Sequence, residues 1–233
     1  MFWQSKKAVT VNGEKPAPVA ASQHGVVVGN NRGRLIFSLD ATASRQPTWD
    51  QACAVQSTMF DVAAELGGLD VKLVFYRGVQ TCKASSWTSD SKQLHSWMNS
   101  VSCEGGSTQI ARVLTHALTM AKTSRVNALV FVGDAMEEDP GVLFELAKEL
   151  GTLRVPIIIF QEGTDAGASS TFKRMAKLSG GAHLNFDLAN VHRLRELLGA
   201  VAAYASGGHS ALLAHGRRSN NAEVLRLTSQ LSG

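Results

Sequence analysis

Short apolar runs recur along the chain and alternate with longer segments of mixed character. They occupy residues 35–39, 71–76, 128–132, 155–160 and 183–186, with a shorter candidate at 80–83. Most are nearly continuous in apolar residues, as expected of parallel strands that are covered on both faces of a sheet. The pattern therefore predicts a buried, largely parallel sheet.

The segments between these runs carry apolar residues three and four positions apart, which is typical of amphipathic helices. The clearest pattern lies at Ile110, Val113, Leu114, Ala117, Leu118 and Ala121. Similar spacing predicts helices at 48–63, 94–98, 140–150, 171–179 and 191–204. Residues 163–170 are small and are expected to form a loop, and Gly207-Gly208 is expected to end the last helix.

Strands that alternate with helices predict an α/β fold. We expect a doubly wound, mostly parallel six-stranded sheet with helices on both faces, which is a Rossmann-like arrangement. Residues 1–31 are rich in Ala, Pro, Gly, Lys and Ser and are expected to be a flexible arm. The folded domain is expected at 32–206, and residues 207–233 form a tail with a weak helical pattern that can dock.

The first predicted strand ends on a carboxylate, and hydroxyls follow at alternate positions. Asp40 is followed by Thr42 and Ser44. In open α/β sheets, ligands bind at the carboxyl ends of the strands. Hard cations such as Mg²⁺ prefer oxygen ligands in near-octahedral order and keep some of their waters. This loop therefore indicates a site for a hard divalent cation.

Two further loops are expected at the same edge of the sheet. Thr108 follows a Gly-Gly-Ser turn that leads into the clearest helix, and Asp134 follows the strand at 128–132. Thr108 has a second interpretation, as the N-cap of that helix. Asp40 and Asp134 have simpler interpretations too, as turn carboxylates. Only the set as a whole favours a metal.

This set resembles the metal-ion-dependent adhesion site (MIDAS) of von Willebrand factor A domains, whose pattern is Asp-x-Ser/Thr-x-Ser, a distant Thr and a later Asp. The resemblance covers residues 33–205, in the order of strands and helices as well as in the motif. It implies that Thr42 and Ser44 bind Mg²⁺ (or Mn²⁺ or Ca²⁺) through their hydroxyls, and that Thr108 does so in the ligand-bound form. Asp40 and Asp134 would orient metal-bound waters.

The sequence departs from the family pattern at two points. Thr42 stands where the first serine is usual, which keeps the hydroxyl. The usual Thr-Asp-Gly is here Gly133-Asp134-Ala135, so the loop around Asp134 is expected to have a different shape.

The resemblance implies a protein-interaction module in which the metal binds a Glu or Asp of a partner protein, with an accessory role beside an ATPase or chaperone system as one context. Two acids and neutral hydroxyls leave a divalent ion electrophilic toward an outside carboxylate. We do not expect an enzyme, since the sequence places no base to activate a bound water. A phosphatase-like hydrolase using Asp40 is one alternative, although Thr42 replaces its second acid. A metal-free scaffold domain is the other.

Residues beside the motif have simpler interpretations. Arg45 is taken as a surface arginine, with capture of a partner carboxylate as the alternative. Residues 137–139 (Glu-Glu-Asp) are expected to be a solvated helix start favoured by the helix dipole. The histidines show no HxxxH or HExxH pair, so none is assigned to a metal.

Composition narrows the class of protein further. The net charge is +4, but the basic residues are dispersed, which argues against nucleic acid as a partner. Three separated cysteines give no disulfide framework, so a reducing compartment is expected. No secretory signal is recognisable, and no continuous run approaches the ~18 apolar residues that span a bilayer. We therefore expect a cytoplasmic protein without a membrane span.

Overall fold

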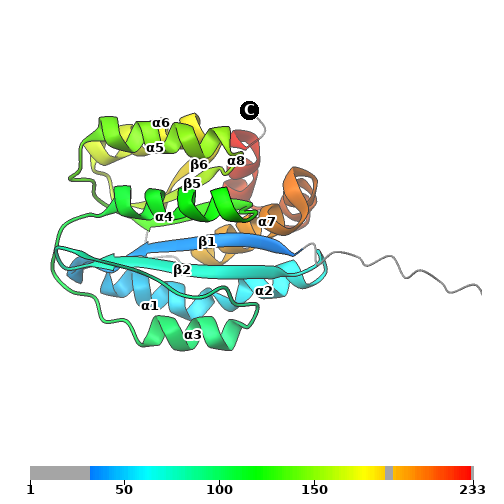
Figure 1. Cartoon of the computed structure of the whole chain (residues 1–233). Helices are drawn as coiled ribbons and strands as arrows, with labels where there is room; N and C mark the ends of the chain where they lie inside the picture. The colour runs from blue at the N-terminus through cyan, green and yellow to red at the C-terminus, as the bar shows by residue number, and fades with distance from the viewer. Residues whose placement is uncertain (1–31, 187–190, 232–233) are drawn as a thin grey trace, which may run out of the picture.

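A computed structural model describes residues 32–186 and 191–231, so the arm predicted at 1–31 lies outside the described residues. A six-stranded sheet has the order β3-β2-β1-β4-β5-β6, and only β3 is antiparallel to its neighbour (Figure 1). The strands are β1 (Gly33–Asp40), β2 (Leu69–Arg77), β3 (Thr81–Ala84), β4 (Ala128–Gly133), β5 (Ile157–Glu162) and β6 (Ala182–Phe186). The predicted fold class is confirmed.

Helices cover both faces of this sheet. They are α1 (Gln46–Val55), α2 (Ser57–Ala64), α3 (Ser91–Asn99), α4 (Ile110–Thr123), α5 (Pro140–Thr152), α6 (Ala166–Ser179), α7 (Val191–Ser219) and α8 (Ala222–Gln230), with a short 3-10 helix at Ala43–Arg45. Helices α4, α5 and α6 lie on one face, and α1, α2, α3 and α7 lie on the other (Figure 1).

Two hydrophobic cores lie on opposite faces of the sheet. Leu35, Phe37 and Leu39 of β1 point into the core beneath α1, α2 and α7, whereas Ile36 points into the core beneath α4, α5 and α6. Successive side chains of a strand point to opposite faces, so an uninterrupted apolar run serves both cores. The strands read as continuous apolar runs for this reason.

Two predicted elements differ from the structure. The helix predicted at 48–63 is two helices separated at Gln56, whose buried side chain donates a hydrogen bond to the carbonyl of Ser91. Helix α6 begins at Ala166, so the predicted loop at 163–170 is wrong in its second half. The Asp165 carboxylate accepts a hydrogen bond from the Ala168 N–H and caps this helix.

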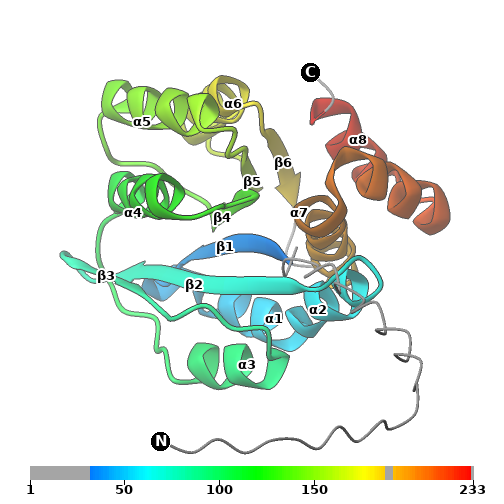
Figure 2. The same ribbon diagram turned by 45° about the vertical axis from the view of Figure 1, so that its right-hand side comes forward.

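The predicted break at Gly207-Gly208 is confirmed: Gly208 has a non-helical, left-handed φ of 70° and kinks α7. A second helical segment follows the kink and continues to Ser219. Helix α8 packs against β6 and α7 (Figure 2). Within the described residues α7 is the one helix long and apolar enough to cross a membrane, but half of its apolar window is buried inside the fold. Packing against α2 and β1 accounts for that apolar face.

Side chains cover the outer edge of β6. The His183 N–H donates to Gln230 Oε1 at 2.8 Å, and Gln230 Nε2 donates to the His183 carbonyl at 3.1 Å. Arg193 Nη2 donates to the carbonyl of Asn185 at 2.9 Å. These bonds satisfy backbone groups that an edge strand otherwise leaves open.

The His183 side chain is buried, and its Nε2 lies 2.8 Å from Gln161 Oε1. Burial lowers the pKa of this imidazole to about 4, and the positive charge of Lys173 acts in the same direction. Because this pKa lies below the ordinary value of 6.5, the unfolded chain binds a proton before the folded protein does. Stability from a neutral His183 is therefore full above pH 6.5 and is lost as the pH falls toward 4.

Replacing His183 with glutamine is expected to flatten the acid side of the stability profile. Wild type should lose free energy of unfolding between about pH 7.5 and about pH 4.5. In His183→Gln this loss should be smaller by roughly 2 to 3 kcal/mol. Urea unfolding at the two pH values measures it. The matched control is His192→Gln, at an exposed histidine, which should keep the wild-type profile. Identical profiles for wild type and His183→Gln would contradict the prediction.

Candidate metal centre

Three neighbouring parallel strands lead to acidic side chains at the same edge of the sheet. Strand β1 ends on Asp40, Asp134 follows β4, and β5 ends on Glu162. Gly133 lies opposite Gln161, so Asp134 and Glu162 come level at the ends of adjacent strands. This edge is where a doubly wound fold binds its ligands. Glu162 was not among the predicted site residues.

The loop after β1 folds back on its own carboxylate. Asp40 is only 4% exposed, and its Oδ1 accepts a hydrogen bond from the Thr42 N–H at 2.7 Å. The Arg45 N–H donates to the Thr42 carbonyl at 2.9 Å and closes the turn. Thr42 is buried, whereas Ser44 lies exposed on the turn. Asp40 is thus fixed inside the edge of the sheet.

The loop that carries Thr108 lies against the Asp40 loop and the end of β2. The Glu104 N–H donates to the Ala41 carbonyl at 3.0 Å. Gly106 approaches Gly78 so closely that a Cβ at this position would lie 2.0 Å from the Gly78 carbonyl oxygen. Only glycine permits this contact, so the Gly-Gly turn brings the Thr108 loop to the site.

Two hydrogen bonds join Thr108, in the loop before α4, to Glu137, in the loop between β4 and α5. The Thr108 N–H donates to Glu137 Oε2 at 3.1 Å, and the Glu137 N–H donates to Thr108 Oγ1 at 3.0 Å. Thr108 does not cap α4 through its side chain. Its hydroxyl oxygen accepts one hydrogen bond and keeps a second lone pair for a metal.

The prediction that residues 137–139 form only a solvated helix start is wrong for Glu138; Glu137 is exposed as predicted but also binds Thr108. The carboxylate of Glu138 accepts hydrogen bonds from the N–H groups of Ile110 and Ala111, both at 2.8 Å. It thereby satisfies amides at the positive end of α4. Asp139 does begin a helix, since its side chain caps α5 through the N–H of Gly141.

Arg45 is partly buried between two acids, so its interpretation as a surface arginine is wrong. Its side chain is 12% exposed, and Nη2 lies 3.1 Å from Asp134 Oδ2. Nη1 binds Glu162 Oε2, which also accepts a hydrogen bond from the Thr48 hydroxyl. Arg45 therefore links the loop after β1 to the ends of β4 and β5.

The charge of Asp40 is not balanced in the same way. Burial is the main cause that raises the pKa of this carboxyl, and the negative charge of Asp134 also raises it; hydrogen bonds from Thr42 lower it. No salt bridge to Asp40 is found within residues 32–186 and 191–231. A carboxylate buried without a cation favours binding of a positive charge beside it.

The donor set fits a hard divalent cation. Asp40 and Asp134 are carboxylates, and the set also includes hydroxyls, which suit Mg²⁺ better than histidine or cysteine would. In the described part of the chain no three His, Cys, Asp or Glu side chains gather around one point, so a site here depends on hydroxyl oxygens. The structure brings Asp40, Thr42, Thr108 and Asp134 to one edge, with Ser44 on the adjoining turn. Arg45 is a competing positive charge.

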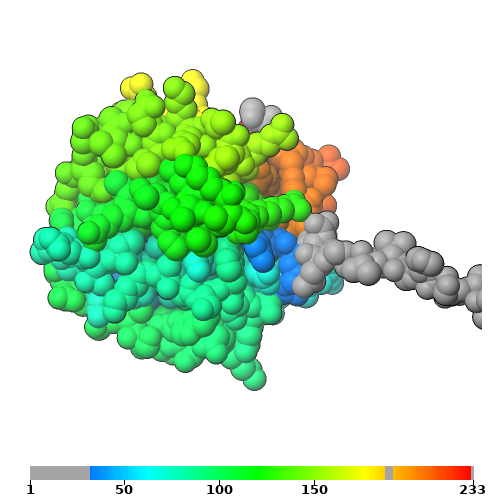
Figure 3. Space-filling view, viewed as in Figure 1, coloured from blue at the N-terminus to red at the C-terminus, as the bar shows by residue number. Residues whose placement is uncertain are grey.

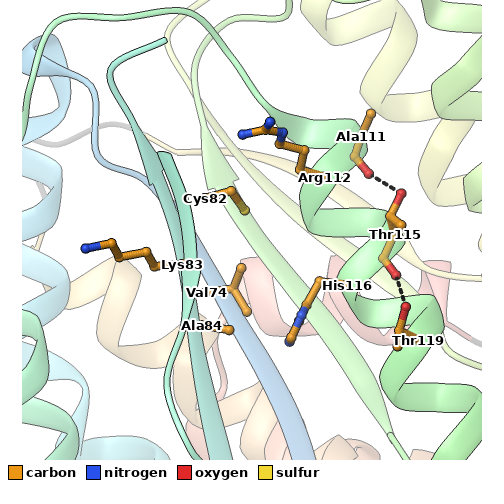
Figure 4. Close-up of a pocket in the computed structure, with 9 residues that line it drawn as sticks. All are labelled: Val74, Cys82, Lys83, Ala84, Ala111, Arg112, Thr115, His116 and Thr119. Carbon is orange, nitrogen blue, oxygen red and sulfur yellow. Dashed lines mark hydrogen bonds between the residues drawn. The ribbon is translucent and has the colours of Figure 1, made fainter. Parts of the chain in front are cut away.

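A separate cavity of about 440 Å³ lies between the edge of the sheet and α4 (Figure 4). In the space-filling view α4 crosses the middle of this face, with α5 above it and α3 below it (Figure 3). The hydroxyls of Thr115 and Thr119 donate to carbonyls of their own helix. His116, Cys82 and Val74 also line the cavity. It includes none of the predicted metal-site residues.

Comparison of the sequence with protein-family models and with curated proteins finds no match. Comparison of the structure finds similar solved structures, among them three that are each 14% identical in sequence. For a von Willebrand factor type A protein from Catenulispora acidiphila the TM-score is 0.62, over 74% of this chain and 43% of that chain. For the SpRpn10 VWA domain the TM-score is 0.54, over 70% of this chain and 95% of that chain. For proximal thread matrix protein 1 of the mussel byssus, with a zinc-occupied MIDAS motif, it is 0.57, over 73% and 46%.

These likenesses establish the fold. The described domain has the α/β architecture of von Willebrand factor A domains, as the order of its strands and helices predicted. The chain spans less than half the length of the Catenulispora and mussel proteins. The metal-occupied motif belongs to the mussel protein.

Proposed function

We propose that this chain, which has the von Willebrand factor A fold, is a divalent-cation-dependent protein-interaction module. Asp40, Thr42, Ser44, Thr108 and Asp134 would hold the cation, with Mg²⁺ as the expected ion. When bound, the metal supplies an electrophilic position for an outside carboxylate. The partner is then a protein that offers a Glu or Asp at this edge of the sheet.

The observation that carries the proposal is the state of Asp40. It is a buried carboxylate at the end of the first strand, with the Thr42 and Thr108 loops beside it, and no salt bridge to it is found among the residues that the structure describes. Burying an unpaired charge is costly, and a metal ion removes that cost. The zinc-occupied motif of the mussel protein, on the same fold, supports the same interpretation.

One observation favours a metal-free scaffold instead. Arg45 already neutralises Asp134, which is one of the two acids proposed for the cation. A chain that uses this ion pair permanently would bind partners through its surface alone. Calorimetry of wild type and Thr42→Val with Mg²⁺ and Mn²⁺ separates the metal-dependent module from the metal-free scaffold.

Replacing Thr42 with valine removes a hydroxyl and keeps the shape of the side chain. We expect the affinity for Mg²⁺ and Mn²⁺, measured by isothermal titration calorimetry, to fall about tenfold or more, because the ion loses an oxygen ligand. Thr115→Val is the matched control, since that hydroxyl binds only the carbonyl of Ala111 in its own helix. Its metal affinity should equal that of wild type.

The same variants test the interaction. A partner protein captured from a lysate by the immobilised chain should be lost on chelation and should bind poorly to Thr42→Val. If the wild-type protein shows no heat and no thermal stabilisation with either ion, the metal-free scaffold is the better interpretation. Phosphate released from an aryl phosphate by wild type and not by Asp40→Asn would favour the hydrolase.

A further inference from the structure

We infer that Arg45 is an internal competitor of the divalent cation: its guanidinium holds Asp134 in the metal-free state and must give up that carboxylate for the metal to bind. The inference rests on the proposed function and adds a form of regulation to the same site. It concerns the position of one positive charge among the acids at the carboxyl edge of the sheet.

The contacts of Arg45 support this role. Nη2 lies 3.1 Å from Asp134 Oδ2, and Nε lies 3.4 Å from Ser44 Oγ. The side chain therefore touches two of the five proposed metal-site residues, one acid and one hydroxyl. A divalent cation that uses these groups meets the guanidinium, and like charges at such distances repel strongly in a partly buried site.

Glu162 gives Arg45 a second position to bind. Its carboxylate pairs with Nη1 of Arg45 and accepts a hydrogen bond from Thr48, and the side chains of both members of the pair are little exposed. If Arg45 releases Asp134, its charge stays paired with Glu162 and is not left buried alone. The arginine thus has two acids, only one of which belongs to the proposed metal site.

This arrangement sets a threshold for the cation. Without metal, Arg45 holds Asp134 and so withholds one of the site's two carboxylates. With metal, both carboxylates face the ion and the guanidinium turns to Glu162. Partner binding then depends on a concentration of divalent cation high enough to displace Arg45.

Titration of the full chain with Mn²⁺ in a calorimeter tests the inference on four proteins. Arg45→Gln should bind Mn²⁺ about tenfold or more tightly than wild type, because the competing charge is gone. Glu162→Gln should bind Mn²⁺ more weakly, because Arg45 then has only Asp134 as a charged partner. Arg174→Gln should match wild type, because it removes an α6 cation that lies over the ring of Phe144 on α5. Arg45→Met, of similar length and uncharged, replaces Arg45→Gln if that variant does not fold.

A second readout measures the ion pair without metal. In chelator, Arg45→Gln should unfold at lower urea than wild type, and added Asp134→Asn should recover part of that loss, because the unpaired carboxylate is then removed. Tighter Mn²⁺ binding together with this coupling supports the inference. Tighter binding by Arg45→Gln when wild type shows none supports it as well.

Two results overturn the inference in distinguishable ways. Unchanged or weaker Mn²⁺ binding by Arg45→Gln, with normal binding by wild type, would make Arg45 a residue that positions Asp134, and the proposed function would stand. Absence of Mn²⁺ binding by every variant, Arg45→Gln and Arg45→Met included, would overturn the proposed function and the competition with it.

Discussion

Replacing Asp40 with asparagine is expected to weaken Mg²⁺ and Mn²⁺ binding by about 10- to 100-fold, the usual cost of removing a group that orients the ligands of a metal. The same change should raise the resistance of the metal-free protein to urea at neutral pH. Burial raises the pKa of Asp40, so its charged form is less favourable in the folded protein than in the unfolded chain. Asparagine keeps an oxygen for the Thr42 N–H and removes the charge.

The sign of the stability change depends on pH. Because the folded pKa of Asp40 is raised, the stability it contributes is present in acid and is lost as the pH rises through that pKa. The advantage of Asp40→Asn should therefore appear at neutral pH and vanish in acid. Asp90→Asn is the matched control, since Asp90 caps α3 and asparagine caps equally well. A metal-free Asp40→Asn protein less stable than wild type at neutral pH would contradict this account.

Replacing Trp49 with alanine is expected to lower the free energy of unfolding by about 3 to 5 kcal/mol, a large part of the total for a domain of this size. Trp49 is 2% exposed, and its Nε1 donates to the Met98 carbonyl at 3.0 Å. Its ring meets Phe75 edge to face, with the centroids 5.8 Å apart. The side chain therefore joins α1 to α3 and to the sheet, a few residues after the Asp40 loop.

Trp49→Phe separates packing from hydrogen bonding. It keeps an aromatic ring and removes the indole N–H, while the Met98 carbonyl still accepts a hydrogen bond from the Val101 N–H at 3.1 Å. Loss of the indole hydrogen bond should therefore cost about 0.5 to 1.5 kcal/mol. Urea unfolding should therefore rank wild type, Trp49→Phe and Trp49→Ala in decreasing stability. A loss below about 1 kcal/mol in Trp49→Ala would show that the surrounding helices close over the cavity.

The strand ends could be predicted from the sequence because they depend on local patterns. An apolar run that stops at Asp40, and another that leads to Asp134, fix both the strand and the edge to which the acids belong. Parallel strands place successive carboxyl ends together without any knowledge of packing. The position of Asp40 and Asp134 at one edge follows from this rule, whereas Thr108 lies in the loop between α3 and α4 and not at the end of a strand.

The charge partners could not be predicted, because they join residues far apart in the chain. Arg45 meets Asp134 and Glu162 only after β1, β4 and β5 lie side by side, and each segment alone shows an ordinary surface residue. The run 137–139 was misinterpreted for the same reason, since Glu138 binds amides of α4 and not of its own helix. A signal for Glu162 was present, as a third acid at the end of an apolar strand.

The prediction of helix boundaries was wrong where the side chains are small. The first turns of α6 are Ala166-Gly167-Ala168-Ser169-Ser170, which carry no apolar periodicity, so the helix was predicted to begin at Thr171. The break at Gln56 depends on a tertiary hydrogen bond to Ser91. Neither signal lies in the spacing of apolar residues.

The side-chain amide of Gln230 makes the two backbone hydrogen bonds at His183 that a neighbouring strand would otherwise make. Together with Arg193 it blocks backbone pairing along the β6 margin, so another polypeptide cannot extend the sheet on that side. Any extended peptide that joins this sheet must do so beside β3, a strand of four residues that includes Lys83. The sheet thus has one covered edge, at β6, and one short edge with a lysine, at β3. Strand pairing with another chain is therefore restricted to the β3 edge.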